Sequence, residues 1–481
     1  MIFSRSWLGL GLPAYEKIVP ICFQHIPEFT FMAAEVRHDP DKRTYIVSNE
    51  RIEATGFKPS ISLDEGIEEY LHSPGAIGVK VLVISAAFPP FRAGEATNAL
   101  YLCRHLADRK LDVHVLTSQS NTAIDDPRIT IHPIMHHWSW LEILRFGTFV
   151  KRCSPDVVLL MYIGFIYNDH PMITFAPTIS KTLLPSVPFV TRIENTFGSL
   201  PHRCPILTRF LRKGFKLWAG AKDVDYEFGT LLRDSDHLIV LSDDHRAKLA
   251  KLFPAVSSKS VLIPPPPNMR ICPENDGAAR QRGREMLGVK PDDFLMVYLG
   301  YIYAGKGIET LLKAFQIVSR QRSNLRLIVV GGILADEYPD RPSYAQEMHE
   351  LADQLGIDDK VTWTGYYAWD SDEASVYLRA ADACVLPFDY GVHLNNSSFA
   401  AAAAHGLPII TTRGAMLEQP FVHQENIFLC PPKNPEAIAT AVETLMDSPE
   451  LRECLRAGAR DLALEWFSWD RNIERTIATF S

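Results

Sequence analysis

The chain has 481 residues, of which 47% are hydrophobic and 22% charged, and its formal net charge is −8 at pH 7. This length exceeds what one hydrophobic core supports, so we expect two or three domains of an ordinary globular protein. The negative charge argues against a general nucleic-acid binder, whose footprint is basic. The eight cysteines are scattered, without a Cys-x-x-Cys pair or a histidine at zinc spacing, which is typical of a reducing compartment. No segment is apolar for long enough to predict a membrane helix, and we find no clear signal sequence, so we expect a cytoplasmic protein.

The first block of the chain ends near Ser73-Pro74-Gly75, where turn residues predict a break. The run from Val47 to Ile67 contains V-S-N, G-F-K-P and S-L-D-E-G-I, and it resembles the C-terminal end of NAD-dependent sugar-nucleotide epimerases of the extended short-chain dehydrogenase type. The block has neither a G-x-x-G-x-x-G after a strand nor a Tyr-x-x-x-Lys pair. We therefore expect no NAD site and no proton shuttle, and we interpret residues 1–78 as an epimerase remnant.

The second block opens at Val79–Ser85, a continuous β-branched run that is typical of a central parallel strand. A loop with Pro89-Pro90 and Gly94-Glu95 follows it, then a helix, and the strand Val113–Thr117 completes a β-α-β unit. The prolines at 264–267 predict a stiff break after this block. Further strands of the block are predicted at Val157–Met161, Pro188–Ile193, His237–Leu241 and Ser260–Ile263.

The third block repeats this plan. Phe294–Gly300 is predicted as its first strand, and Lys306-Gly307 opens the helix that follows. Two doubly wound halves place a ligand in the cleft between them, beyond the carboxyl ends of their strands. The other strands of the block are predicted at Leu325–Val330, Lys360–Trp363, Ala383–Leu386 and Pro408–Thr411.

A polar loop leads from Pro387 to Asn396 and into an alanine-rich helix that starts near Ser397 or Ser398. Gly406 stands where a left-handed helix stop belongs. Backbone N–H groups that are free at a helix start, with the helix dipole behind them, bind phosphate. The alternative is an ordinary capped helix in a parallel sheet.

The order and spacing of these motifs over about residues 79–481 resemble the group 1 glycosyltransferases of family 4. The matching motifs are the Pro-Pro turn with Gly94-Glu95, Gly300 with Lys306-Gly307, and the run Ala404-x-Gly406-x-Pro408-x-x-Thr411. The resemblance implies an α/β protein of the GT-B fold, with two Rossmann-like doubly wound domains facing a cleft and the short appendage in front. It implies an acceptor-side domain at 79–265, a nucleotide-sugar domain at 266–465, and a C-terminal helix at 466–481 that crosses back to the first domain.

Three positions depart from the family pattern. The family has two glutamates eight positions apart around the nucleotide loop, and His393 and Ala401 occupy those places here. The second glutamate accepts hydrogen bonds from ribose hydroxyls, which an alanine cannot do. An arginine is expected after Gly300, where this chain has Tyr301, so Lys306 is left as the single point charge for a pyrophosphate.

From this resemblance we assign each candidate site residue a role, with a plainer alternative for several of them. Lys306 could be a solvated first-turn lysine, Gly94 a turn residue and Glu95 a partner of the helix dipole. Arg192 and Glu194 could form a salt bridge only, and His393 could be a surface histidine. The predicted catalytic residues are His393, Glu194 and Arg192, the acceptor-side loop holds Gly94 and Glu95, and the donor site holds Gly300, Lys306, Gly307, Asn395, Asn396, Ser397 and Ser398.

The resulting hypothesis is a glycosyltransferase that moves a sugar from a nucleoside diphosphate to a saccharide or lipid-linked acceptor. The resemblance implies retention of configuration, and we expect neither a metal nor NAD nor a nucleic-acid partner. Two alternatives stay open: a GT-B-fold protein that binds a nucleotide sugar with little or no turnover, and an epimerase-linked bifunctional protein. The basic and aromatic run Arg209–Trp218 could rest on the inner face of an anionic membrane, although inward packing of its aromatic residues is the favoured alternative.

Overall fold

The computed structural model describes residues 78–120, 124, 126–196, 227–332 and 343–481. The chain separates into one unit at 1–76 and a second at 77–481, and only the second is described. The predicted epimerase remnant and the run 209–218 therefore lie outside the described residues.

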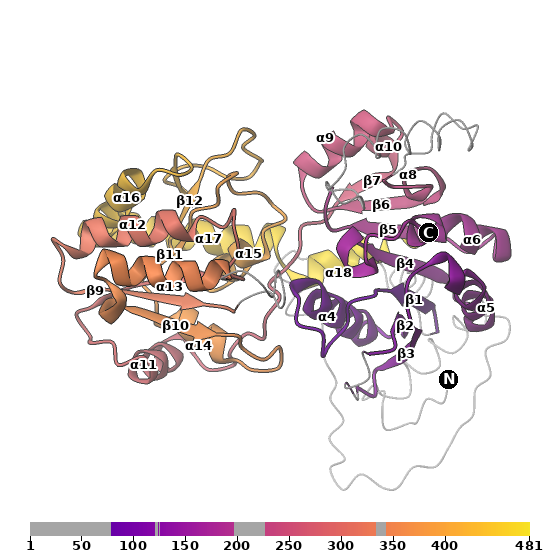
Figure 1. The fold of residues 1–481 in the computed structure, drawn as a ribbon, viewed down its shortest axis with the longest axis horizontal. Helices are drawn as coiled ribbons and strands as arrows, with labels where there is room; N and C mark the ends of the chain where they lie inside the picture. The colour runs from indigo at the N-terminus through magenta and orange to yellow at the C-terminus, as the bar shows by residue number, and fades with distance from the viewer. Residues whose placement is uncertain (1–77, 121–123, 125, 197–226, 333–342) are drawn as a thin grey trace, which may run out of the picture. The chain divides into compact units, whose positions relative to one another are not determined.

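The first domain of the second unit is built on a parallel sheet of seven strands in the order β3-β2-β1-β4-β5-β6-β7 (Figure 1). The strands are β1 (Lys80–Ile84), β2 (Asp112–Ser118), β3 (Ile129–Met135), β4 (Val157–Tyr162), β5 (Phe189–Ile193), β6 (His237–Val240) and β7 (Ser260–Leu262). The helices are α4 (Gly94–Asp108), η1 (Trp140–Glu142), α5 (Ile143–Cys153), η2 (Gly164–Tyr167), η3 (Pro171–Phe175), α6 (Ala176–Leu183), α8 (Leu231–Asp234), α9 (Asp243–Leu252) and α10 (Val256–Lys259).

The predicted strands of this domain are confirmed to within one or two residues, and β3 was missed. Its residues are mostly half-buried and include Pro133, as in an edge strand, so β3 lacks the continuous apolar run that marks the central strands.

The second domain has a parallel sheet of six strands in the order β10-β9-β8-β11-β12-β13. Its strands are β8 (Phe294–Leu299), β9 (Leu325–Val330), β10 (Val361–Gly365), β11 (Ala383–Leu386), β12 (Ile409–Thr412) and β13 (Phe428–Cys430), of which the three-residue β13 was not predicted. The helices are α11 (Asp276–Met286), α12 (Ile308–Ser319), α13 (Tyr344–Leu355), η4 (Asp358–Lys360), α14 (Glu373–Ala380), α15 (Ser397–Ala404), α16 (Pro435–Asp447) and α17 (Pro449–Trp466). The predicted α/β class with two Rossmann-like parallel sheets is confirmed.

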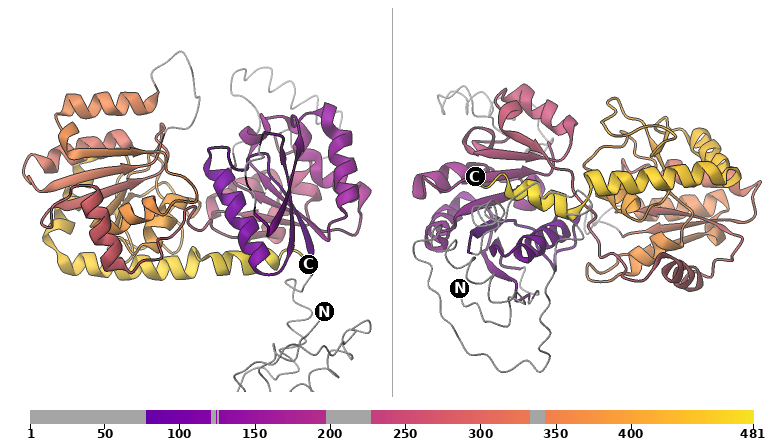
Figure 2. Two further views of the ribbon diagram at one scale, coloured as in Figure 1. Left: turned by 90° about the horizontal axis from the view of Figure 1, so that it is seen from below. Right: turned by 180° about the vertical axis from the view of Figure 1, so that it is seen from behind.

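The last helix, α18 (Trp469–Ile477), packs on the first domain beside α4 (Figure 2). The Trp469 ring stacks on His105 of α4 with their centroids 4.5 Å apart. Asn472 Nδ2 donates to the carbonyl of Pro264 at 2.9 Å, and Ile473 is buried among core residues of the first domain. The chain end thus completes the core of the first domain.

Strand order decides where the loops meet. In each sheet the order reverses at the first strand, between β1 and β4 in the first domain and between β8 and β11 in the second. Loops that leave the carboxyl ends of these strands diverge to opposite faces and leave a crevice between them. The loops after β1, β4, β8 and β11 are therefore the places where a ligand site is expected.

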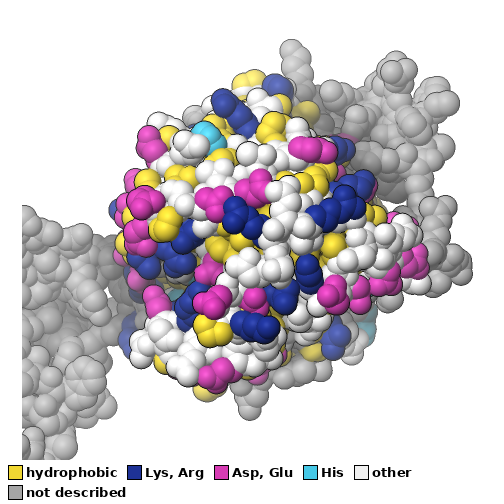
Figure 3. Space-filling view, turned by 90° about the vertical axis from the view of Figure 1, so that its left-hand side faces the viewer, with side chains coloured by type: hydrophobic (Ala, Val, Ile, Leu, Met, Phe, Trp, Pro, Cys, Tyr) yellow, Lys and Arg dark blue, Asp and Glu magenta, His cyan; other side chains and the backbone are white. Residues whose placement is uncertain are grey.

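None of the helices in the described ranges is long and apolar enough to cross a membrane. On the face of the second domain seen in Figure 3, acidic and basic side chains are interspersed, without a broad basic area of the kind that nucleic-acid binders carry.

Candidate functional site

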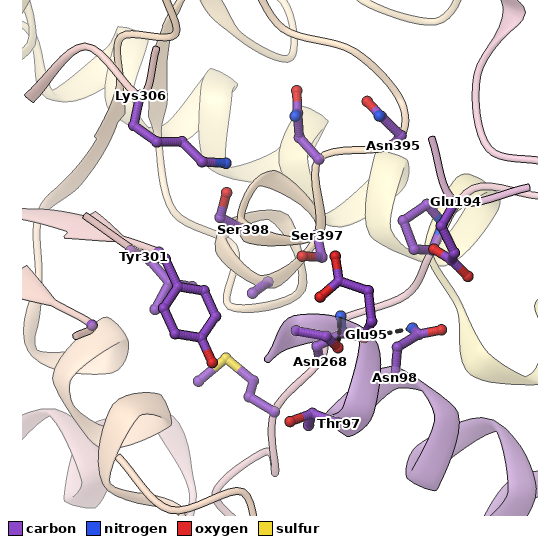
Figure 4. Close-up of a pocket in the computed structure, with 18 of the residues that line it drawn as sticks. Glu95, Thr97, Asn98, Glu194, Asn268, Tyr301, Lys306, Asn395, Ser397 and Ser398 are labelled. Carbon is purple, nitrogen blue, oxygen red and sulfur yellow. Dashed lines mark hydrogen bonds between the residues drawn. The ribbon is translucent and has the colours of Figure 1, made fainter. Parts of the chain in front are cut away.

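A cavity of about 450 Å³ lies between the two α/β domains, and the loops at both strand-order reversals line it. Figure 4 shows the first turn of α4 on one side of it and the start of α15 with Lys306 on the other. Of the predicted site residues, those that line the cavity are Gly94, Glu95, Glu194, Gly300, Lys306, Asn395, Asn396, Ser397 and Ser398.

The start of α15 faces the cavity without a side-chain cap. Asn396 occupies the N-cap position, but its Oδ1 accepts from the N–H of His393 at 2.7 Å and not from the helix. The N–H groups of Ser397 and Ser398 have no acceptor in the part of the chain that the structure describes. An uncapped helix start that borders a cavity is suited to bind an anion.

Lys306 extends into the same cavity towards Ser398 (Figure 4). Its Nζ lies 5.0 Å from the ring centroid of Tyr303 and 5.2 Å from that of Phe388, and no carboxylate among the described residues forms an ion pair with it. Two aromatic rings thus hold a lysine whose charge is not neutralised by a neighbouring acid.

Gly307 does not line the cavity but fixes the residues that do. It is the N-cap of α12 with φ +74°, and a Cβ there would collide with the backbone carbonyl of Pro387. The loop after β8 can approach β11 this closely only with glycine at 307. The predicted donor residue Gly307 therefore acts through the backbone, by placing Lys306.

The first-domain side of the cavity is acidic and rich in amides. Asn98 Nδ2 donates to Asn268 Oδ1 at 2.6 Å, and Asn268 Nδ2 donates to the carbonyl of Gly94 at 3.4 Å (Figure 4). Burial raises the pKa of Glu95 to about 6. The hydrogen bond from its own backbone N–H and the charge of Lys306 lower this pKa, whereas the charge of Glu194 raises it further. A carboxyl group that shares its cavity with another acid is thus poised to exchange a proton near neutral pH.

Arg192 is placed differently from the prediction. Its side chain is fully buried and does not line the cavity, and its Nε lies 2.6 Å from Oε1 of Glu194. Burial raises the pKa of Glu194, and Arg192 opposes the rise. Arg192 is therefore a buried partner of Glu194, which itself reaches the cavity wall.

His393 also lies away from the cavity lining. Its Nδ1 is 3.6 Å from Oε2 of Glu418, a side chain with no exposed surface. The prediction placed His393 on the donor sugar because the motif position faces the ligand in the family, but here the ring turns to this carboxylate. Ala401, at the ribose position of the motif, does line the cavity.

Sequence reasoning missed an aromatic wall and the amide pair. The wall follows β8 and β10, and the guanidinium of Arg92 stacks on one of its rings, that of Tyr366, at 4.7 Å. The dense Y-Y-A-W run directly after β10 was a signal for it, because residues at a strand's carboxyl end face the crevice. The wall consists of Tyr301, Tyr303, Tyr366, Tyr367 and Trp369.

The second domain is similar in sequence to known proteins. Residues 279–462 match the family model described as glycosyl transferases group 1. A D-inositol 3-phosphate glycosyltransferase of Jonesia denitrificans is 26% identical over 258 residues, 52% of this chain and 58% of the relative. The chain spans about half the length of the curated relatives it matches, from 47% to 59%.

Two solved structures share the fold over most of the chain. Sucrose-phosphate synthase from Thermosynechococcus elongatus superposes with a TM-score of 0.59 at 19% identity, covering 82% of this chain and 97% of that one. Anabaena Alr3699/HepE, in complex with UDP and glucose, gives a TM-score of 0.60 at 15% identity and covers 83% of this chain and 98% of its own. Identities this low establish the fold alone. The chain therefore has the GT-B fold, and its residues 279–462 are similar to the group 1 glycosyltransferases.

Proposed function

We propose that the protein transfers a sugar from a nucleoside diphosphate donor to a hydroxyl group of a saccharide or lipid-linked acceptor, with retention of anomeric configuration and without a required metal. The observation that carries this proposal is the convergence of Lys306 and the uncapped start of α15 on one cavity. The group 1 match of the second domain supports the donor class, as does the UDP complex of the structural neighbour Alr3699/HepE.

The chemical demand of such a transfer is to stabilise a pyrophosphate leaving group as the glycosidic bond breaks. Lys306 and the N–H groups of Ser397 and Ser398 would supply positive charge and hydrogen bonds to it, preorganised before the reaction starts. We assign no protein nucleophile. The acceptor hydroxyl would attack from the face that the departing phosphate vacates, and its proton would pass to that phosphate.

The first-domain side would bind the acceptor. Its carboxylates and amides accept or donate hydrogen bonds to hydroxyl groups, as a saccharide requires. Glu95 lies in this wall, and burial raises its pKa to about 6, which suits a carboxyl that takes up and releases a proton slightly below neutral pH.

A second candidate is a nucleotide-sugar binding protein with little turnover. Two observations favour it: Ala401 offers no acceptor to a ribose, and His393 contacts Glu418 instead of the cavity. Both candidates predict donor binding, and only the first predicts transfer.

Titration with UDP, GDP, ADP and TDP, by calorimetry and by thermal shift, tests the binding they share. A ligand at one hundred times its dissociation constant should stabilise the fold by about 2.7 kcal/mol. Release of the diphosphate from the matching nucleotide sugars, measured with and without EDTA, then separates transfer from binding. If none of the four nucleotides binds, both candidates are wrong.

The ribose position offers a gain-of-function test. Ala401→Glu restores a carboxylate on α15 at the cavity wall, and it should tighten diphosphate binding because a carboxylate accepts from both ribose hydroxyls. Ala401→Gln, of nearly the same size but neutral, is the control. An equal effect of the two substitutions would contradict a ribose at this place.

A further inference from the structure

One buried carboxylate, that of Glu418, forms hydrogen bonds with both α/β domains next to the cavity. Oε1 of Glu418 accepts from the backbone N–H of Asp243 at 2.6 Å and of Asp244 at 3.2 Å, the first two residues of α9 in the first domain. Its Oε2 accepts from the backbone N–H of Leu394 at 2.6 Å and lies 3.6 Å from His393 Nδ1 in the second domain. Each oxygen of this carboxylate therefore serves a different domain.

The segment held by Oε2 is the one that leads into the uncapped helix. We call residues 393–396 the donor loop, because Asn395 and Asn396 line the cavity and α15 begins directly after them. A second contact supports the same junction, since Nε2 of His245 on α9 lies 3.3 Å from Nδ2 of Asn395. The first domain thus reaches the donor loop directly through His245 and indirectly through Glu418.

The charge of Glu418 is well compensated although its side chain has no exposed surface. Burial would raise the pKa of this carboxyl, but His393 and the N–H groups of Leu394 and Asp244 outweigh burial and hold the pKa below its usual range. A buried carboxylate that lost the N–H groups of α9 would keep its charge with only half of its partners, which is costly.

We propose that Glu418 is a positioning residue that couples the approach of the first domain to the conformation of the donor loop. When the N-terminus of α9 is in place, the carboxylate is fully hydrogen-bonded and holds the N–H of Leu394, which orders the loop for a diphosphate. When the domains separate, Glu418 loses its partners on α9 and the loop loses its anchor. This inference rests on the proposed donor site, and it adds that diphosphate binding and domain approach stabilise each other.

The first-domain side can be cut without touching the donor loop. Asp243 is the first residue of α9, a position where proline is favoured, and the preceding Ser242 is extended (φ −154°, ψ 159°), as a residue before proline prefers. Asp243→Pro removes the N–H that donates to Glu418 and leaves the helix intact. Asp243→Ala is the matched control, because it removes the same side chain and keeps the N–H.

The second-domain side is tested with Glu418→Gln, which keeps the shape and replaces one acceptor oxygen by a donor. Glu425→Gln, a neutralised exposed glutamate seven positions on, is its control. The ligand is whichever of UDP, GDP, ADP and TDP binds the wild-type chain most tightly. We expect Asp243→Pro and Glu418→Gln each to weaken its binding about tenfold, the loss of one charge-assisted hydrogen bond, while both controls stay within twofold.

The double variant separates coupling from simple damage. If both substitutions break one junction, Asp243→Pro combined with Glu418→Gln should bind little worse than either alone, whereas independent effects would multiply. A second readout needs no nucleotide: solution scattering should give a larger radius of gyration for Asp243→Pro than for Asp243→Ala. Thermal melting identifies any variant that has lost its fold.

The outcomes are distinct. Weaker binding with Glu418→Gln but not with Asp243→Pro would confine Glu418 to the second domain and overturn the coupling. If no nucleotide binds the wild-type chain, the proposed function fails, and equal radii of gyration for the two Asp243 variants would then overturn the junction itself.

Discussion

The sharpest test of the proposed donor site is the removal of its lysine. Lys306→Ala deletes the ammonium group that enters the cavity between Tyr303 and Phe388 and leaves the backbone at Gly307, which places the loop, unchanged. Because no carboxylate in the described ranges pairs with Lys306, its removal leaves no charge unpaired in the free protein. We therefore expect the fold to keep its stability.

The magnitude follows from the kind of bond that is lost. A hydrogen bond from a charged donor contributes about 1.5–3 kcal/mol. Lys306→Ala should thus weaken diphosphate binding roughly 10- to 150-fold at about 1.4 kcal/mol for each factor of ten. Binding of the corresponding nucleoside, which carries no phosphate, should change less than twofold.

Calorimetry with the diphosphate and the nucleoside measures both effects on one protein. Lys313→Ala is the control, because Lys313 lies on α12, is 43% exposed and pairs with Glu309 at the surface. Unchanged diphosphate affinity, or an equal loss for diphosphate and nucleoside, would refute the assignment of Lys306 to the pyrophosphate.

Three further predictions concern groups around the cavity. Gly307→Ala should destabilise the fold in urea unfolding and abolish diphosphate binding, since the new Cβ would meet a backbone carbonyl. Gly356→Ala is the control: with a similar φ of +67° but open space around it, it measures the cost of the backbone conformation without the collision. Arg192→Met should lower the unfolding free energy by about 3–5 kcal/mol because it leaves Glu194 buried without its partner, and adding Glu194→Gln should recover part of that loss. The folded chain holds the Glu95 proton more tightly than the unfolded chain, with a pKa of about 6 against 4.5, so this stabilisation is complete below pH 4.5 and lost as the pH rises through 6. At about 1.4 kcal/mol per pKa unit, the wild-type chain should lose about 2 kcal/mol of unfolding free energy over that range relative to Glu95→Gln. Parallel pH profiles of unfolding free energy for the two proteins would contradict this prediction.

The sequence by itself determined most strands of the fold and the start and end of α15. Continuous apolar runs predicted the central strands because both faces of such a strand are buried. Gly406, with φ +60°, follows the end of α15 as predicted. The small polar residues in front of the helix mark its start at Ser397. These features are local, since the chain conformation within a few residues decides them.

Tertiary structure decided which side chains reach the cavity. The sequence predicted both Arg192 and Glu194 at the cleft. Arg192 lies within β5 and is buried, whereas Glu194 follows the end of the strand and reaches the cavity wall. His393 turns to Glu418, which lies 25 residues later in the chain, and Glu418 in turn binds α9 some 174 residues earlier. Hydrogen bonds between segments this far apart leave no periodic signal in the sequence, because they depend on how the two domains and their loops pack and not on local propensity.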